Sequence, residues 1–235
     1  MAQHIHSHRR TSFMAAFLLT TLILAGTTSV GFAASYELPA DTKAKLEQLP
    51  DARTKAEFLE PLAATLDADP AYHFELGNAY FDLSQFEKAE QHFQRATGLA
   101  PDYLAASVNL GSVYDELGRL DDALGAYRAA LKIDPDEEKT LCNIGGVFFQ
   151  KRQISQAMTS FQKAIEKHPD SQLAHYNLAI LFADSKIYGE AIVEWQKVVD
   201  IDAASDLGSR SADNIEIIKQ MQEVDLGDDH SGHDH

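Results

Sequence analysis

Three groups of residues in this chain could do chemistry. The first is a series of asparagines, Asn109, Asn143 and Asn177, spaced by 34 residues. Each side-chain amide offers both a donor and an acceptor, so a row of them could pair with the main chain of an extended peptide of any sequence. Asparagine at a regular spacing could equally serve local packing, and both interpretations stay open at this point.

The second group lies in residues 225–235, which read DLGDDHSGHDH. The imidazoles of His230, His233 and His235, with the neighbouring aspartates, could bind Zn²⁺, Ni²⁺ or Cu²⁺. The stretch has no apolar periodicity, which predicts a disordered tail. Because a flexible tail must order itself to bind an ion, a merely solvated end is the alternative to a metal-handling role.

The third candidate is Cys142, the only cysteine in the chain. An intramolecular disulfide is excluded, which leaves a free thiol or a link to another chain. A small apolar residue packed between helices is the simpler interpretation. The sequence has no glycine-rich phosphate loop, no paired-cysteine metal site and no His-Glu-x-x-His motif. We therefore predict a protein with neither enzymatic activity nor a cofactor.

The elements that must position these residues follow a period of 34 residues between positions 70 and 205. A small residue recurs in each copy, at Gly77, Gly111, Gly145 and Ala179. Alanine follows twelve residues later, and large aromatics follow three and sixteen residues later. We expect the small residue to face this alanine at a close helix crossing, with the aromatics filling the space beside it. In the first three copies a proline then ends the second helix.

These registered positions resemble the tetratricopeptide repeat, in which two helices form a hairpin and successive hairpins stack. The resemblance implies an all-α fold, a right-handed α-solenoid of four helix-turn-helix hairpins at 70–103, 104–137, 138–171 and 172–205. One departure concerns the aromatic usual near the start of the first helix, whose place is taken by His73, Ser107, Leu141 and His175.

A hairpin cannot cover its own apolar stripe, so we expect helical caps at both ends of the array. Residues 34–69 lie outside the repeat register, and we predict that they form an amino-terminal helical cap. Pro50 divides this cap into two helical parts. Pro61 either opens a further short helix or kinks the second part. Residues 206–224 predict a carboxyl-terminal capping helix near Trp195. Its apolar face is predicted to comprise Ile217, Ile218, Met221 and Val224.

Residues 1–33 have the pattern of an export signal. A positively charged start precedes an apolar stretch of about 13 residues, and small residues stand before a cut after Ala33. A membrane-spanning helix needs about 20 residues. We therefore predict a cleaved signal and a periplasmic or secreted protein, with an uncleaved amino-terminal membrane anchor as the alternative.

The first helices of stacks in this family line a concave groove, so the resemblance implies that the asparagines contact a bound peptide there. Neighbouring first-helix positions add aromatic and acidic side chains, although we expect one or two of the aromatics to pack against a neighbouring repeat instead. The predicted partner-binding residues are Asn109, Asn143, Asn177, Asn78, Phe74, Phe81, Phe149, Tyr176, Asp115 and Glu116. Asp82 and Asp184 supply further carboxylates. The set of lysines and arginines that some members use to grip a carboxy-terminal carboxylate is missing, which disfavours that mode of binding.

The charge balance narrows the class of partner. The chain has 20 Lys and Arg against 36 Asp and Glu, a net charge of −16, and its part after residue 33 carries −18. Such a chain repels nucleic acid and anionic membranes. It would attract basic partners, and a surface that only keeps the chain soluble is the alternative interpretation. We predict a non-enzymatic scaffold that binds a peptide segment or helix of an envelope protein. Metal handling by the tail and self-association through the groove are the alternatives.

Overall fold

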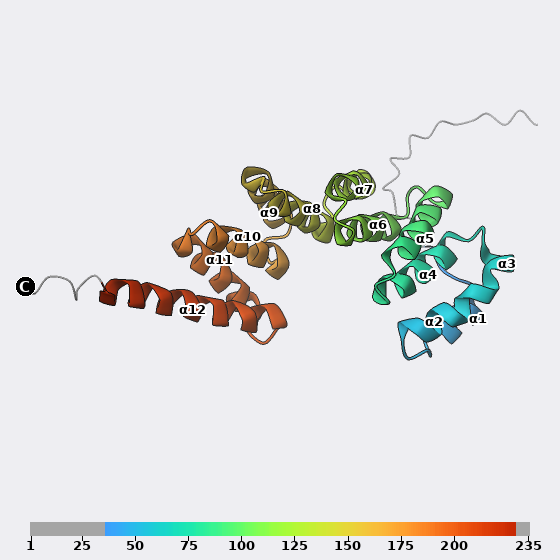
Figure 1. Cartoon of the computed structure of the whole chain (residues 1–235), viewed down its shortest axis with the longest axis horizontal. Coiled ribbons are helices and arrows are strands. Elements are labelled where there is room, and N and C mark those ends of the chain that lie inside the picture. Colours follow the sequence, from blue (N-terminus) through green and yellow to red (C-terminus); the bar gives the residue numbers. More distant parts are fainter. Residues whose placement is uncertain (1–35, 229–235) are drawn as a thin grey trace, which may run out of the picture. The chain divides into compact units, whose positions relative to one another are not determined.

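The structure is a computed structural model that describes residues 36–228, with side chains described as far as residue 222. All its regular elements in this range are helices (Figure 1). Four helical hairpins follow one another: α4 (Pro70–Asp82) with α5 (Phe86–Leu99), α6 (Leu104–Glu116) with α7 (Leu120–Ile133), α8 (Glu138–Gln150) with α9 (Ile154–Lys167), and α10 (Gln172–Asp184) with α11 (Tyr188–Ile201). The predicted all-α fold of four stacked hairpins is confirmed.

Short polar side chains cap the amino ends of two of the first helices, α4 and α10. The Asp69 carboxylate accepts a hydrogen bond from the Ala71 amide at 2.8 Å, and Pro70 is the first residue of α4. The Ser171 hydroxyl likewise accepts from the Ala174 amide at the start of α10, at 3.0 Å. Both pairings satisfy amides that have no partner inside the helix. A proline lies two residues past the end of α5, α7 and α9, as the sequence predicts.

The turn inside each hairpin has the same backbone geometry although its residues differ. One residue in each turn is left-handed, with φ between 56° and 70°: Ser84, Gly118, Arg152 and Lys186. The next residue donates to a carbonyl five positions earlier, as Gln85 does to Tyr80 at 2.8 Å. This bond closes the end of the first helix and reverses the chain. Only Gly118 has the residue type that this geometry favours.

In the first three hairpins a glycine of the first helix lies against an aromatic ring of the second. A Cβ placed on Gly77 would lie 2.8 Å from the Phe93 ring. Gly111 and Gly145 meet the rings sixteen residues on in the same way. The flat ring occupies the space that a Cβ would need at these glycines. The contact between each glycine and the alanine twelve residues on stays a prediction.

Each hairpin packs on the next through both of its helices. The second helices α5, α7 and α9 contact the following first helices α6, α8 and α10, and successive first helices also contact one another. Large aromatic side chains fill the core, where Phe93, Tyr127 and Phe161 are 2% exposed or less. Because successive first helices contact one another, polar residues at equivalent positions of these helices lie on neighbouring helices.

The amino-terminal cap comprises α1 (Ala40–Leu46), α2 (Ala52–Leu59), a short 3₁₀ turn η1 (Glu60–Leu62) and α3 (Ala63–Leu66). Pro61 lies in the 3₁₀ turn, where its lack of an amide hydrogen is tolerated. Leu59 is fully buried in one apolar cluster with Tyr72 and Leu76 of the first hairpin. The cap thus covers the apolar surface that the first hairpin would otherwise expose.

The helix that follows the last hairpin, α12 (Asp206–Asp228), continues four residues beyond the predicted end at 224. It packs on α11 and α10, with Ile215 and Ile218 in one cluster with Trp195. Ile217 and Met221 are 53% and 49% exposed, so the predicted apolar face was wrong for both residues. Isoleucines occur on two sides of this helix, and only the packing selects the side that is buried.

Candidate binding groove

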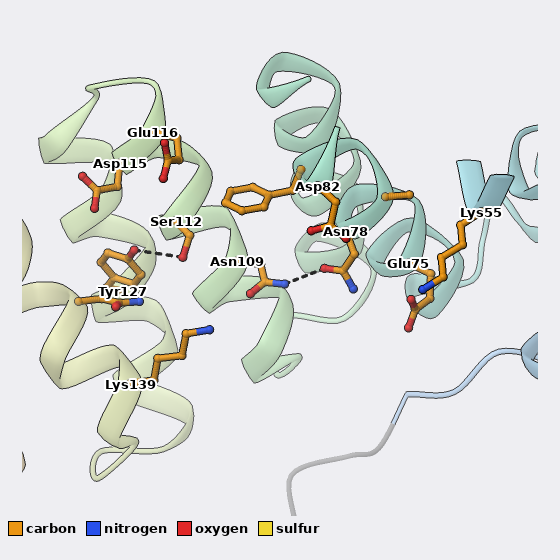
Figure 2. Close-up of a pocket in the computed structure, with 13 residues that line it drawn as sticks. Lys55, Glu75, Asn78, Asp82, Asn109, Ser112, Asp115, Glu116, Tyr127 and Lys139 are labelled. Carbon is orange, nitrogen blue, oxygen red and sulfur yellow. Dashed lines mark hydrogen bonds between the residues drawn. The ribbon is translucent and has the colours of Figure 1, made fainter. Parts of the chain in front are cut away.

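A groove of about 600 Å³ runs across the first helices of the first three hairpins (Figure 2). The cap and one second helix complete its walls. The lining residues are Lys55, Glu75, Asn78, Ala79, Phe81, Asp82, Asn109, Ser112, Asp115, Glu116, Tyr127, Lys139 and Asn143. The fourth hairpin contributes none of these residues, so the groove covers three of the four repeats.

An amide strip runs along the groove through Asn78, Asn109 and Asn143, all half-buried. The Asn109 Nδ2 donates to the Asn78 Oδ1 at 2.8 Å, a bond that joins adjacent hairpins. Each of these two amides still has a donor or acceptor atom that this bond does not use. Asn177 has the same register position as Asn109 but does not line the groove. The structure therefore brings three of the four predicted asparagines together.

Glu75 occupies the strip position that asparagine takes in the later repeats. Burial raises the pKa of its carboxyl, and the Asn78 amide and the Lys55 ammonium act in the opposite direction. Figure 2 shows the Lys55 side chain directed towards Glu75 at one end of the groove. This end of the strip is therefore more polar than the asparagine series alone would make it.

Three carboxylates lie at the carboxyl ends of the first helices. Asp82 ends α4, and Asp115 and Glu116 end α6. Asp115 accepts a hydrogen bond from Gln150 Nε2 of the next hairpin at 2.8 Å. Asp184, the fourth predicted carboxylate, pairs with Arg152 at 3.0 Å and lies outside the groove. The acidic character that the sequence predicts is thus concentrated in the first two repeats.

The predicted aromatic residues have different locations. Phe81 lines the groove, but Phe74 packs between hairpins, with ring centroids 4.9 Å from Tyr103 and 5.9 Å from Phe93. Tyr176 is only 9% exposed, and the guanidinium carbon of Arg210, on α12, lies 5.3 Å from the centroid of its ring. Phe149 is half-buried and lies outside the lining. Large rings at these positions pack against neighbouring helices, and of the four predicted aromatics Phe81 alone lines the groove.

The predicted set lacks six of the lining residues, among them Lys55, Tyr127 and Lys139. Lys55 belongs to the cap and so follows no repeat pattern. Lys139 takes a register position that the other repeats fill with alanine or leucine. Tyr127 belongs to a second helix, yet its hydroxyl donates to Ser112 Oγ at 3.3 Å, and burial raises its pKa to about 12. A search for charge at positions where the repeat is otherwise apolar could have found Lys139.

The repeats match a known sequence family over more than half of the chain. The family model described as tetratricopeptide repeat matches residues 74–138 and 143–206. This chain belongs to the tetratricopeptide repeat family. The family fold is a scaffold for protein–protein interaction, and proteins of this family are in general non-enzymatic.

Solved tetratricopeptide structures have the same fold. MamA residues 41 to the end from Desulfovibrio magneticus RS-1 is 19% identical, with a TM-score of 0.62 over 71% of this chain and 93% of that one. TTC0263 from Thermus thermophilus is 20% identical, with a TM-score of 0.61 over 72% and 93%. YrrB, described as having an unusual peptide-binding site, is 17% identical, with a TM-score of 0.56 over 74% and 86%. No curated protein matches the chain.

Other predicted features lie outside the described residues of this tetratricopeptide protein. They are the signal at 1–33 and the tail histidines His230, His233 and His235. Metal binding by the tail stays a prediction, which titration of Zn²⁺ into the chain and into a chain ending at Leu226 would test. Within residues 36–228, no helix combines the length and the apolar character that crossing a bilayer requires.

Proposed function

We propose that this tetratricopeptide protein holds an extended segment of a partner protein across α4, α6 and α8. The observation that carries the proposal is the amide strip of Asn78, Asn109 and Asn143 along a groove of about 600 Å³. Side-chain amides can pair with the main chain of a bound segment without reading its sequence. Phe81 offers an apolar contact within the same groove, and the carboxylates favour a partner with basic side chains.

The fourth repeat supplies a matched control for this proposal. Asn109→Ala with Asn143→Ala removes two strip amides, whereas Asn177→Ala removes the equivalent amide outside the groove. Capture of a cross-linked and identified partner should fall at least about tenfold for the double variant, equivalent to ~1.4 kcal/mol. The Asn177→Ala variant should capture the partner as well as the unaltered chain does. Equal capture by all three would refute the groove assignment.

We also propose that the chain works outside the cytoplasm, with residues 1–33 removed. The proposal rests on the positively charged start, the apolar stretch and the small residues before Ala34. Fractionation of the native host should place the protein in the periplasm or the medium, and its intact mass should correspond to a chain that begins at Ala34. An intact mass that retains the first 33 residues, found in the membrane fraction, would support the anchored alternative instead.

A further inference from the structure

The groove has two edges of opposite charge on either side of the amide strip. Asp82, Asp115 and Glu116 lie in the last turns of α4 and α6. Lys139 lies in the first turn of α8. Figure 2 shows Lys139 on the opposite side of Asn109 and Ser112 from Asp115 and Glu116. One edge of the groove is therefore acidic and the other carries an ammonium group.

These edge charges have few partners inside the chain. Asp82, Glu116 and Lys139 take part in none of the side-chain hydrogen bonds and ion pairs found among residues 36–222, and Asp115 is joined only to a neutral glutamine, by the bond from Gln150. Charges elsewhere join successive repeats, as in Arg119 with Glu90 at 2.9 Å and Lys151 with Asp121 at 2.7 Å. The groove charges thus remain available to a bound segment.

The helix dipoles act in the same direction as the side chains. The carboxyl end of a helix carries a partial negative charge and the amino end a partial positive charge. The acids stand at carboxyl ends and Lys139 at an amino end. The helix ends and these side chains therefore add negative charge to one edge of the groove and positive charge to the other.

In an extended segment that lies across the first helices, alternate side chains would face the two oppositely charged edges of the groove. Its successive side chains point to opposite sides, and side chains on one side recur every ~7 Å. Packed helices are about 8–10 Å apart, so two basic side chains on one side could reach the acids of α4 and α6. Side chains on the other side of the segment would point towards the edge that carries Lys139.

We infer that the groove selects an extended partner segment whose basic and acidic side chains alternate, with the basic ones on the acidic edge and an acidic one at Lys139. The inference rests on the proposed function and specifies the partner chemistry that the groove prefers. Specificity of this kind comes from the order of the charges, in which two segments of the same net charge can differ.

Two synthetic peptides of identical composition test the inference. In the alternating peptide lysine and glutamate follow one another, and in the block peptide the same residues form two runs. Fluorescence anisotropy at low ionic strength should give about fivefold tighter binding of the alternating peptide, because pairs at the rim of a groove are each worth ~0.2–1 kcal/mol.

A charge-reversal variant has a matched control. Lys139→Glu should abolish the preference for the alternating peptide. Lys163→Glu changes the net charge equally at an exposed residue of α9 outside the groove and should preserve the preference. Equal affinities for both peptides, equal effects of the two variants, or no binding of either peptide would overturn the charge-order inference.

The same measurements separate this inference from the proposed function. If Asn109→Ala with Asn143→Ala weakens both peptides equally while their order makes no difference, the groove binds segments but does not select alternating charge. If the double variant leaves partner capture and both peptides unaffected, the proposed function itself fails.

Discussion

The first and fourth hairpins place a buried histidine at the same register position and give it different partners. His73 Nε2 lies 2.9 Å from the Asp67 carbonyl oxygen, and His175 Nε2 lies 3.0 Å from that of Pro169. The backbone contact is therefore the same in the two hairpins. The second contact of each ring comes from the residue 19 positions later, on the second helix.

In the first hairpin this later residue is another histidine. The Nδ1 atoms of His73 and His92 are 3.1 Å apart. Burial, followed by the charge of His73, lowers the pKa of His92 to about 4, while Glu60 and Asp67 raise it and Lys88 lowers it further. In the fourth hairpin Glu194 takes this place, with its Oε2 2.6 Å from His175. One residue on the second helix thus changes the electrostatics of an otherwise equivalent site.

The largest expected effect comes from the glycine beside this site. Gly77→Leu would insert a side chain where the Phe93 ring already lies 2.8 Å from an ideal Cβ, costing ~3 kcal/mol by overpacking. Ala179→Gly, at the equivalent position of the fourth hairpin, should cost only ~1 kcal/mol. Hydrogen exchange measured separately for each hairpin should show that Gly77→Leu lowers protection in residues 70–99. Equal losses in the two hairpins would contradict the difference in packing.

The glutamate partner gives the next largest effect. Glu194→Ala should destabilise the fourth hairpin by ~1–3 kcal/mol, because the buried His175 ring loses its Nδ1 partner. Glu190→Ala removes an exposed carboxylate from the same helix and is the control. Faster exchange in residues 172–201 for Glu194→Ala alone is the expected result. Indistinguishable exchange in the two variants would show that the contact contributes no stability.

Acidification should weaken the first hairpin through His92. The folded pKa of about 4 lies below the ordinary value of 6.5, so the unfolded chain binds more protons between these values. Local stability is therefore highest above pH 6.5 and falls as the pH approaches 4, by ~1–2 kcal/mol after allowance for the partial exposure of the ring. Exchange of residues 70–99, corrected for intrinsic rates, measures this loss.

Replacing His92 by glutamate gives His73 the kind of partner that His175 has in the fourth hairpin, and so tests whether His92 causes the pH dependence. His92→Glu recreates the histidine–glutamate contact in the first hairpin and should remove the loss of protection between pH 6.5 and 5. His92→Gln separates the loss of the titrating ring from the gain of a carboxylate. An unchanged pH dependence in both variants would assign the effect to another group.

The smallest effect concerns the turns, where the two hairpins are alike. Ser84→Gly and Lys186→Gly should each stabilise by ~0.5–1 kcal/mol, because both residues have a left-handed backbone, with φ of 56° and 60°. Thermal unfolding should show similar gains for both substitutions. A gain in one hairpin only would mean that the turns differ in more than their residue types.

The stack of helical hairpins could be predicted from spacing, because small, aromatic and proline residues recur in register. The buried face of α12 could not, since Ile217 and Ile218 are adjacent in sequence and only packing against Trp195 selects between them. The candidate site was predictable in part. Asn109 and Asn143 follow the repeat, whereas Lys55 and Lys139 are exceptions to it and carry no periodic signal.

The sequence by itself determined a stack of helical hairpins, because each hairpin carries more apolar surface than it can bury alone. It also determined which positions are polar on each first helix. Only the tertiary structure decided which of them share a groove, since Asn143 lines it and the equivalent Asn177 does not. The reason is that the groove is formed by several helices together, including α2 of the amino-terminal cap, whereas the fourth hairpin packs against α12. Those arrangements depend on how elements distant in sequence pack, which a uniform repeat does not encode.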